Sequence, residues 1–129
     1  MTLILDASIW LAALDPDDRF HEPSRSLVHR DVTALDLTLY EVANVATVRW
    51  SDPASARDVY DLVFNACEVL IRVDEDLLEE TIAVAAREHI TVYDAAYVAA
   101  AARESYELVS TDFPDLVDRG LAKPPDYFK

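Results

Sequence analysis

Four acidic side chains stand at matching places in the sequence, where a predicted strand ends or the next helix begins. They are Asp6, Glu41, Asp94 and Asp112. The carboxyl ends of parallel strands meet at one edge of a sheet, so residues far apart in the sequence are expected to lie together there. Gathered carboxylates repel one another unless a cation shares the site, and hard divalent cations prefer oxygen ligands. The pattern therefore predicts a Mg²⁺ or Mn²⁺ site that could polarise a phosphoryl oxygen and activate water.

Each of these acids also has a purely structural interpretation. The segments 38–41 and 91–94 match the capping box, in which the acid at the third helical position bonds back to the cap residue. Asp6 and Asp112 suit simple helix N-caps, and acids are enriched in first helical turns in any case. For any one acid the structural interpretation is the more common case, whereas the coincidence of four favours a functional site.

Short apolar segments alternate with helical patterns, and these elements would position the acids. Strands are expected at residues 3–5, 31–37, 67–73 and 107–110, with an edge strand in the tail 121–128. Helices are expected at residues 8–14, 22–30, 38–50, 54–66, 74–89 and 93–104. The alternation predicts an α/β fold, a single domain over residues 1–129, with a mostly parallel sheet of four to five strands and helices on both faces.

The composition limits the classes of function. No run approaches the roughly 20 apolar residues of a membrane span and no signal-peptide pattern opens the chain, so a cytoplasmic protein without membrane association is expected. Gly120 is the only glycine, which argues against the glycine-rich loops of nucleotide-binding folds. Cys67 is the only cysteine, which rules out an internal disulfide or a cysteine-based metal cluster.

The charge balance is strongly acidic, with a formal net charge of −14. Nine arginines and two lysines form no basic run, and such a balance ordinarily argues against nucleic-acid binding. Salt adaptation or a neutralising partner would account for it, and any phosphate-binding surface must use scattered arginines or metal ions. Tyr40, Tyr93 and Tyr97 could stack on nucleobases, but their helical spacing with Val and Ala favours the core.

Four short segments carry the acids in order along the whole chain. They read LILDASIWLAAL, LTLYEVANVATV, ITVYDAAYVAAAA and LVSTDFPDL. Together they resemble PIN-domain ribonucleases and, among them, the VapC toxins of type II toxin–antitoxin systems. The resemblance implies a metal-dependent endoribonuclease in which the four acids hold one or two Mg²⁺ or Mn²⁺ ions and RNA phosphodiester bonds are hydrolysed.

The resemblance also implies auxiliary residues and partners. Ser8 is expected to be a hydroxyl partner of the first acid, and Asp115 an auxiliary acid near the last one. A cognate VapB-type antitoxin is the expected inhibitor, with an arginine-bearing segment that enters the acidic cleft. A symmetric homodimer is also expected, because the helices 38–50 and 54–66 offer apolar faces that a short sheet cannot cover.

Three alternative functions remain open at this stage. Phosphatases of the haloacid-dehalogenase type need a second acid two residues after the first, and Ser8 occupies that place. Receiver-like domains need an acidic pair and a lysine near the last strand, whereas this chain has Asp6 alone and no lysine before Lys123. A catalytically silent PIN-type interaction module is disfavoured by the presence of all four acids, but the sequence leaves it open.

Overall fold

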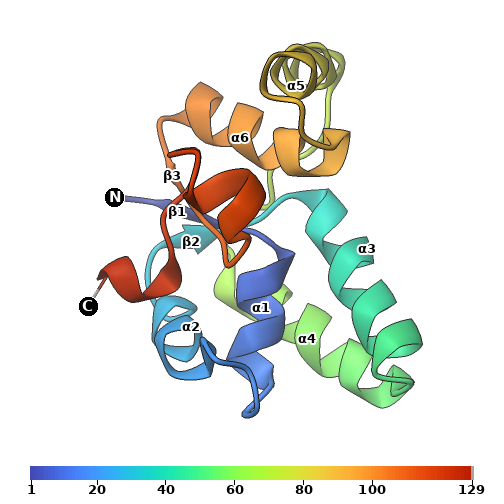
Figure 1. Cartoon of the computed structure of the whole chain (residues 1–129). Coiled ribbons are helices and arrows are strands. Elements are labelled where there is room, and N and C mark those ends of the chain that lie inside the picture. Colours follow the sequence, from blue (N-terminus) through green and yellow to red (C-terminus); the bar gives the residue numbers. More distant parts are fainter. Residues whose placement is uncertain (129) are drawn as a thin grey trace.

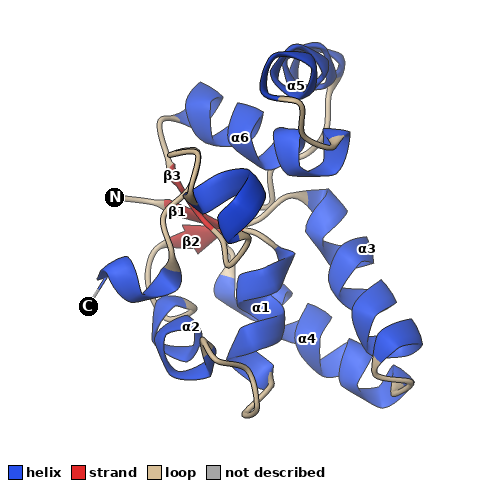
Figure 2. Ribbon diagram, in the orientation of Figure 1, coloured by secondary structure: helices blue, strands red, loops and turns tan. Residues whose placement is uncertain are grey.

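The computed structural model describes residues 1–128, in which helices surround a small parallel sheet (Figure 1 and Figure 2). The strands are β1 (Leu3–Leu5), β2 (Val32–Thr33) and β3 (Glu107–Val109). The helices are α1 (Ala7–Leu14), α2 (His21–Leu27), α3 (Asp36–Asn44), α4 (Pro53–Ala66), α5 (Glu75–Glu88) and α6 (Val92–Glu104). Three shorter helical turns are η1 (Val45–Arg49), η2 (Phe113–Val117) and η3 (Pro125–Phe128).

The strand β1 is the centre of the sheet. The strand order is β2-β1-β3 and both neighbours run parallel to β1, with Leu3 opposite Val32 on one side and opposite Glu107 on the other. Because the three strands point the same way, the residues that follow them emerge at one edge. Asp6 follows the central strand and therefore lies in the middle of that edge.

Helices cover both faces of the sheet, as expected. Side chains alternate along a strand, so Leu3 and Leu5 join one hydrophobic cluster while Ile4 joins the other. The first cluster includes Trp10 of α1 and residues of α4, and the second includes Tyr97 and other residues of α5 and α6. Figure 1 shows these two layers below and above the strands. Within residues 1–128, no helix is long and apolar enough to cross a membrane.

The sheet has three strands, so the expectation of four to five is wrong. The segment 67–73 contributes a single bridge, between Ile71 and Leu35, and the tail contributes another, between Lys123 and Val109. The reason is the early start of α3 at Asp36, which ends β2 and leaves the segment 67–73 without a strand to pair with. Apolar alternation can mark a strand, but a ladder also needs a partner of equal length.

The start of α3 also corrects the expected helix at 38–50. Thr38 is the third residue of α3, and its Oγ accepts the backbone N–H of Leu35 at 3.2 Å. Further on, the helix widens into the π-helical turn η1, closed by the N–H of Trp50 to the carbonyl of Val45 at 3.0 Å. The residue Ser51 then takes a left-handed conformation, with φ of 53°, and separates η1 from α4.

Candidate functional site

The carboxylate of Asp6 lies buried at the end of β1, with 7% of the residue exposed. It caps α1 by accepting the N–H of Ser8 at 3.0 Å, and it also accepts the Ser8 hydroxyl. Burial raises the pKa of Asp6 to about 6, against the lowering effect of hydrogen bonds from Ser110 and Ser8. The value of about 6 includes a raising effect of the nearby carboxylates of Glu41 and Asp94, so Asp6 shares its surroundings with two other acids.

Two serines join the segment after β3 to the first acid. The Ser8 oxygen accepts the N–H of Thr111 at 3.0 Å, so the same hydroxyl contacts both Asp6 and the chain that leads to Asp112. Ser110 is fully buried, and its hydroxyl oxygen accepts the N–H of Asp112 at 2.9 Å. These bonds fix where the last acid stands relative to β1. Ser8 was expected beside the first acid, and the structure places it there.

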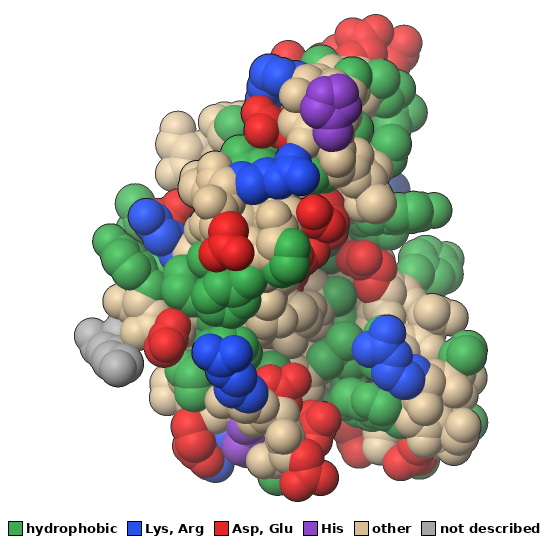
Figure 3. Space-filling view, viewed as in Figure 1, with side chains coloured by type: hydrophobic (Ala, Val, Ile, Leu, Met, Phe, Trp, Pro, Cys, Tyr) green, Lys and Arg blue, Asp and Glu red, His purple; other side chains and the backbone are tan. Residues whose placement is uncertain are grey.

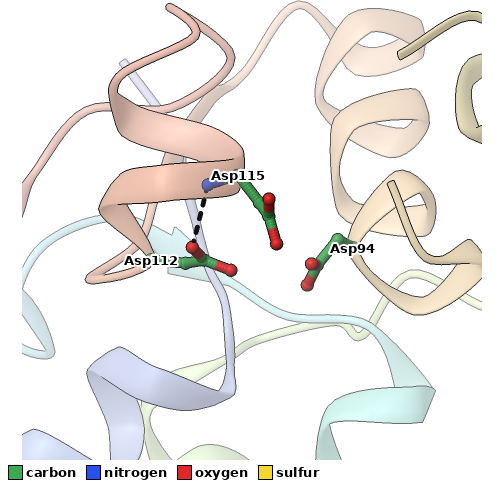
Figure 4. A group of neighbouring side chains, drawn as sticks. All are labelled: Asp94, Asp112 and Asp115. Atoms are coloured by element: carbon green, nitrogen blue, oxygen red, sulfur yellow. Dashed lines mark hydrogen bonds between the residues drawn. The ribbon is translucent and has the colours of Figure 1, made fainter. Parts of the chain in front are cut away.

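Three carboxylates approach one another closely at the front of the site. One oxygen from each of Asp94, Asp112 and Asp115 lies within 4.8 Å of the other two. Figure 4 shows Asp94, on α6, facing the two acids of the segment after β3. The carboxylate of Asp112 caps η2 by accepting the N–H of Asp115 at 3.1 Å. Burial raises the pKa of Asp94, and the charges of Asp112 and Asp115 raise it further.

The remaining acid, Glu41, comes from α3 and is half-buried. The hydroxyl of Tyr97 donates to its Oε1 at 2.6 Å. Burial raises the pKa of Glu41, the Tyr97 hydrogen bond lowers it, and the Asp94 carboxylate raises it again. Thr38 is the third residue of α3 and not its N-cap, so the capping-box interpretation of Glu41 is wrong.

The capping interpretation holds in part for Asp94. The hydroxyl of Thr91, the N-cap of α6, accepts the N–H of Asp94 at 3.1 Å. The reciprocal bond from the Thr91 backbone N–H to the Asp94 carboxylate does not occur among residues 1–128, and that carboxylate approaches Asp112 and Asp115. Asp6 and Asp112 are N-caps as well as members of the acidic group.

Taken together, the structure gathers acids from four separate segments at the carboxyl edge of the sheet. The tightest set includes Asp115, which the sequence indicated only as auxiliary. It does not include Asp6 or Glu41, although the Asp94 charge raises the pKa of both. The Nη2 atom of Arg119 lies 3.7 Å from Asp115 and partly offsets its charge. In Figure 3 acidic side chains gather between the upper layer and α3. Half-buried donors that offer only oxygen atoms, among them Asp94 with its raised pKa, fit a hard divalent cation.

Sequence reasoning did not identify Tyr97, Ser110 or Arg119 as neighbours of the acids. A signal existed for Tyr97, which follows Asp94 by three residues and therefore lies on the same side of its helix. No comparable signal existed for Ser110 and Arg119, because their positions depend on how the segment after β3 turns.

Comparison with known proteins identifies the family. Residues 3–113 match the PIN domain family. Ribonuclease VapC3 of Pyrobaculum aerophilum is 31% identical over 132 residues, covering 91% of this chain and 98% of that protein. Among solved structures, the Mycobacterium tuberculosis toxin VapC20, a Sarcin-Ricin loop cleaving toxin, has a TM-score of 0.77 at 17% identity, covering 92% of this chain and 95% of that one.

A toxin–antitoxin complex from Klebsiella pneumoniae gives a TM-score of 0.72 at 19% identity, covering 95% of this chain and 97% of the matched one. At such identities the solved structures show a common fold alone. The family match and the curated relative go further, because both extend over most of the chain. The chain therefore belongs to the PIN domain family, which its four acid-bearing segments had indicated.

Proposed function

We propose that this chain is a metal-dependent endoribonuclease of the VapC type, the toxin component of a toxin–antitoxin module. The observation that carries the proposal is the convergence of acids from four segments on one sheet edge in a PIN-domain chain. The relative named Ribonuclease VapC3 supports RNA as the substrate. The structure titled a toxin–antitoxin complex supports a cognate antitoxin as a partner, and the −14 charge suits an arginine-bearing inhibitory segment.

In this proposal the closest three acids would hold Mg²⁺ or Mn²⁺ together with Glu41 and Asp6 beside them; the three are Asp94, Asp112 and Asp115. A divalent cation bound there would polarise a phosphoryl oxygen and make water a better nucleophile. The protein's own contribution is to hold the carboxylates in place before the ion arrives. Ser8 and Ser110 do so for Asp6, and the N–H of Asp115 does so for Asp112.

Mapping RNA ends after a short pulse of expression tests this function. Wild type should create new RNA ends at defined positions, and the Asp94→Asn variant, expressed to the same level, should not. Identical sets of ends in the two samples would contradict the proposal, because cleavage would then not depend on the acid site.

A groove beside the acids offers one place for the RNA backbone. Ser8 and Thr111, which border the acids, line this groove together with Arg49. Asp15 and Asp18 line it as well, so Arg49 is the only cation among its lining residues. Arg49 forms no ion pair with any residue of the described chain, 1–128, which leaves its guanidinium available for a phosphate.

Replacing Arg49 by alanine should weaken RNA binding roughly tenfold, because hydrogen bonds to charged groups contribute about 1.5–3 kcal/mol. The KM for RNA should rise at low salt and kcat should change little. Arg72→Ala is a matched control, since Arg72 is also exposed and without an ion pair among residues 1–128. It lines a separate hollow that includes none of the five acids of the candidate site. Equal effects of both substitutions would mean that general charge, and not the groove, controls binding.

We also propose that the chain forms a homodimer, through a different surface from the one expected from the sequence. Leu39, Trp50 and Leu62, on the faces first expected, pack against the core. Exposed apolar side chains instead surround a hollow between α5 and α6, and Figure 3 shows hydrophobic side chains along α5. Those that line the hollow are Val73, Leu78, Val92 and Tyr93, and exposed Ile82 follows one turn after Leu78 on α5. We propose that a second copy of the chain covers this surface in a symmetric dimer.

The Ile82→Arg variant should then sediment as a monomer at tens of micromolar, because a dimer would bury the new charge without a partner. Ile82 is 54% exposed, so the substitution should leave the fold intact. Val48→Arg, at a 67% exposed position on η1, is the matched control and should remain dimeric. A wild-type chain that is itself monomeric in moderate salt would contradict the proposal.

A further inference from the structure

The hydroxyl of Tyr97 lies between two side chains of α3. It donates to Glu41 Oε1 at 2.6 Å and lies 2.6 Å from Thr38 Oγ. Tyr97 is 2% exposed and Thr38 is fully buried. Groups buried this deeply cannot exchange such bonds for bonds to bulk water, so the contacts hold both hydroxyls in fixed positions.

The proton of each hydroxyl can be assigned from its partners. An ionised carboxylate only accepts hydrogen bonds, so the single proton of Tyr97 points to Glu41. The hydroxyl of Thr38 must then donate to the Tyr97 oxygen, while its own oxygen accepts the N–H of Leu35 at 3.2 Å. A directed chain of hydrogen bonds therefore runs from the start of α3, through α6, and back to Glu41.

This chain connects two acids of the site through one helix. Tyr97 and Asp94 are three residues apart on α6 and lie on the same side of it, so a rigid helix carries one acid and the donor to another. The bond occupies Oε1 of Glu41, and Oε2 accepts no hydrogen bond from residues 1–128. We propose that Tyr97 is a positioning residue that fixes the Glu41 carboxylate for cation binding, and that Thr38 orients Tyr97. This inference rests on the proposed metal-dependent function.

Measuring the affinity for a cation shows whether Tyr97 positions Glu41 or only packs in the core. The measurement does not depend on catalysis. Calorimetric titration of the purified, metal-free chain with Mn²⁺ gives a Kd for each variant. Tyr97→Phe should weaken Mn²⁺ binding by about tenfold or more, the effect typical of groups that orient metal ligands. Tyr60→Phe is the control, because Tyr60 is half-buried against Phe64 and its hydroxyl makes no hydrogen bond within residues 1–128. Its Kd should stay within about twofold of wild type.

Two substitutions at Thr38 give an independent comparison. Thr38→Ser keeps the hydroxyl and opens a small cavity, whereas Thr38→Val keeps the shape and removes the hydroxyl. Positioning predicts near-normal Mn²⁺ affinity for Thr38→Ser and a severalfold loss for Thr38→Val. A packing role predicts that Thr38→Ser is the weaker binder. This pair also decides the matter if Tyr97→Phe fails to fold.

The outcomes distinguish this inference from the function on which it rests. If wild type binds Mn²⁺ and Tyr97→Phe binds it equally well, the positioning role is wrong while the metal site stands. The positioning role is also wrong, and the metal site stands, if Thr38→Ser binds Mn²⁺ as weakly as Thr38→Val does. If wild type itself does not bind Mn²⁺, the proposed metal site is wrong, and the positioning role is wrong with it.

Discussion

Replacing Asp94 by asparagine should lower the rate of RNA cleavage by the purified chain roughly a thousandfold, since metal ligation contributes several kcal/mol and about 1.4 kcal/mol corresponds to tenfold. Asp94 is the best single position, because its charge acts on Asp6 and Glu41 and its oxygen approaches Asp112 and Asp115. Asparagine keeps the shape and the helix but removes the negative oxygen. Initial rates on a labelled RNA in excess Mg²⁺ measure the effect.

The matched control is Asp126→Asn, an exposed aspartate of η3 outside the acidic group, and its rate should stay close to that of wild type. The substitutions Asp6→Asn, Glu41→Gln and Asp112→Asn should act in the same direction as Asp94→Asn. Full activity in two or more of these four variants, each shown to be folded, would contradict the assignment of the acids.

Lowering the pH from about 7.5 to about 5 should stabilise the metal-free chain through Asp6. The folded pKa of Asp6 is about 6, above its ordinary 3.8, so the folded state binds the proton more tightly than the unfolded state. The cost of the buried charge is therefore present above pH 6 and is relieved as the pH falls through 6 toward 3.8. The full difference of about two pKa units corresponds to about 3 kcal/mol, of which lowering the pH to about 5 recovers roughly half. The pKa values of Glu41 and Asp94 are also raised, which adds to the same trend.

Urea unfolding in EDTA at several pH values measures this effect, with Asp6→Asn as the comparison. The variant should be more stable than wild type at pH 7.5 and should depend less on pH, because its neutral side chain carries no buried charge. Adding Mg²⁺ should narrow the difference in stability between wild type and Asp6→Asn. A ligand at ten times its Kd stabilises the folded state by roughly 1.4 kcal/mol, and wild type should gain more of this stabilisation than the variant. An unchanged pH dependence in Asp6→Asn would show that Asp6 is not the group that titrates.

Local patterns predicted most of the elements but not the extent of the sheet. The run Leu3–Leu5 is apolar on both sides and lies in the centre of the sheet, as expected from its sequence. The segment 67–73 has the composition of a strand, yet a strand forms only beside a partner, and β2 ends where α3 begins. The pattern at 38–41 suggested that a helix starts at Thr38. In the structure α3 has already begun, and the Thr38 hydroxyl oxygen accepts the N–H of Leu35, the residue before the helix.

The convergence of the acids follows from strand direction, so sequence reasoning could predict that they lie at one edge. Their metal-binding role stays a prediction. The closeness of Asp115 depends on the π-helical turn after Asp112, and the bond from Tyr97 to Glu41 joins residues 56 apart in sequence. Tyr40 and Tyr93 were expected in the core and are 82% and 62% exposed, because helical spacing alone does not show which side of a helix meets the core.

Anomalous diffraction from crystals grown with Mn²⁺ tests the central claim most directly, because it locates the ion itself. The account predicts a manganese peak in contact with carboxylate oxygens of Asp94 and of Asp112 or Asp115, and no such peak in crystals of Asp94→Asn. A peak that touches none of these acids, or no peak at a Mn²⁺ concentration that supports RNA cleavage, would contradict it.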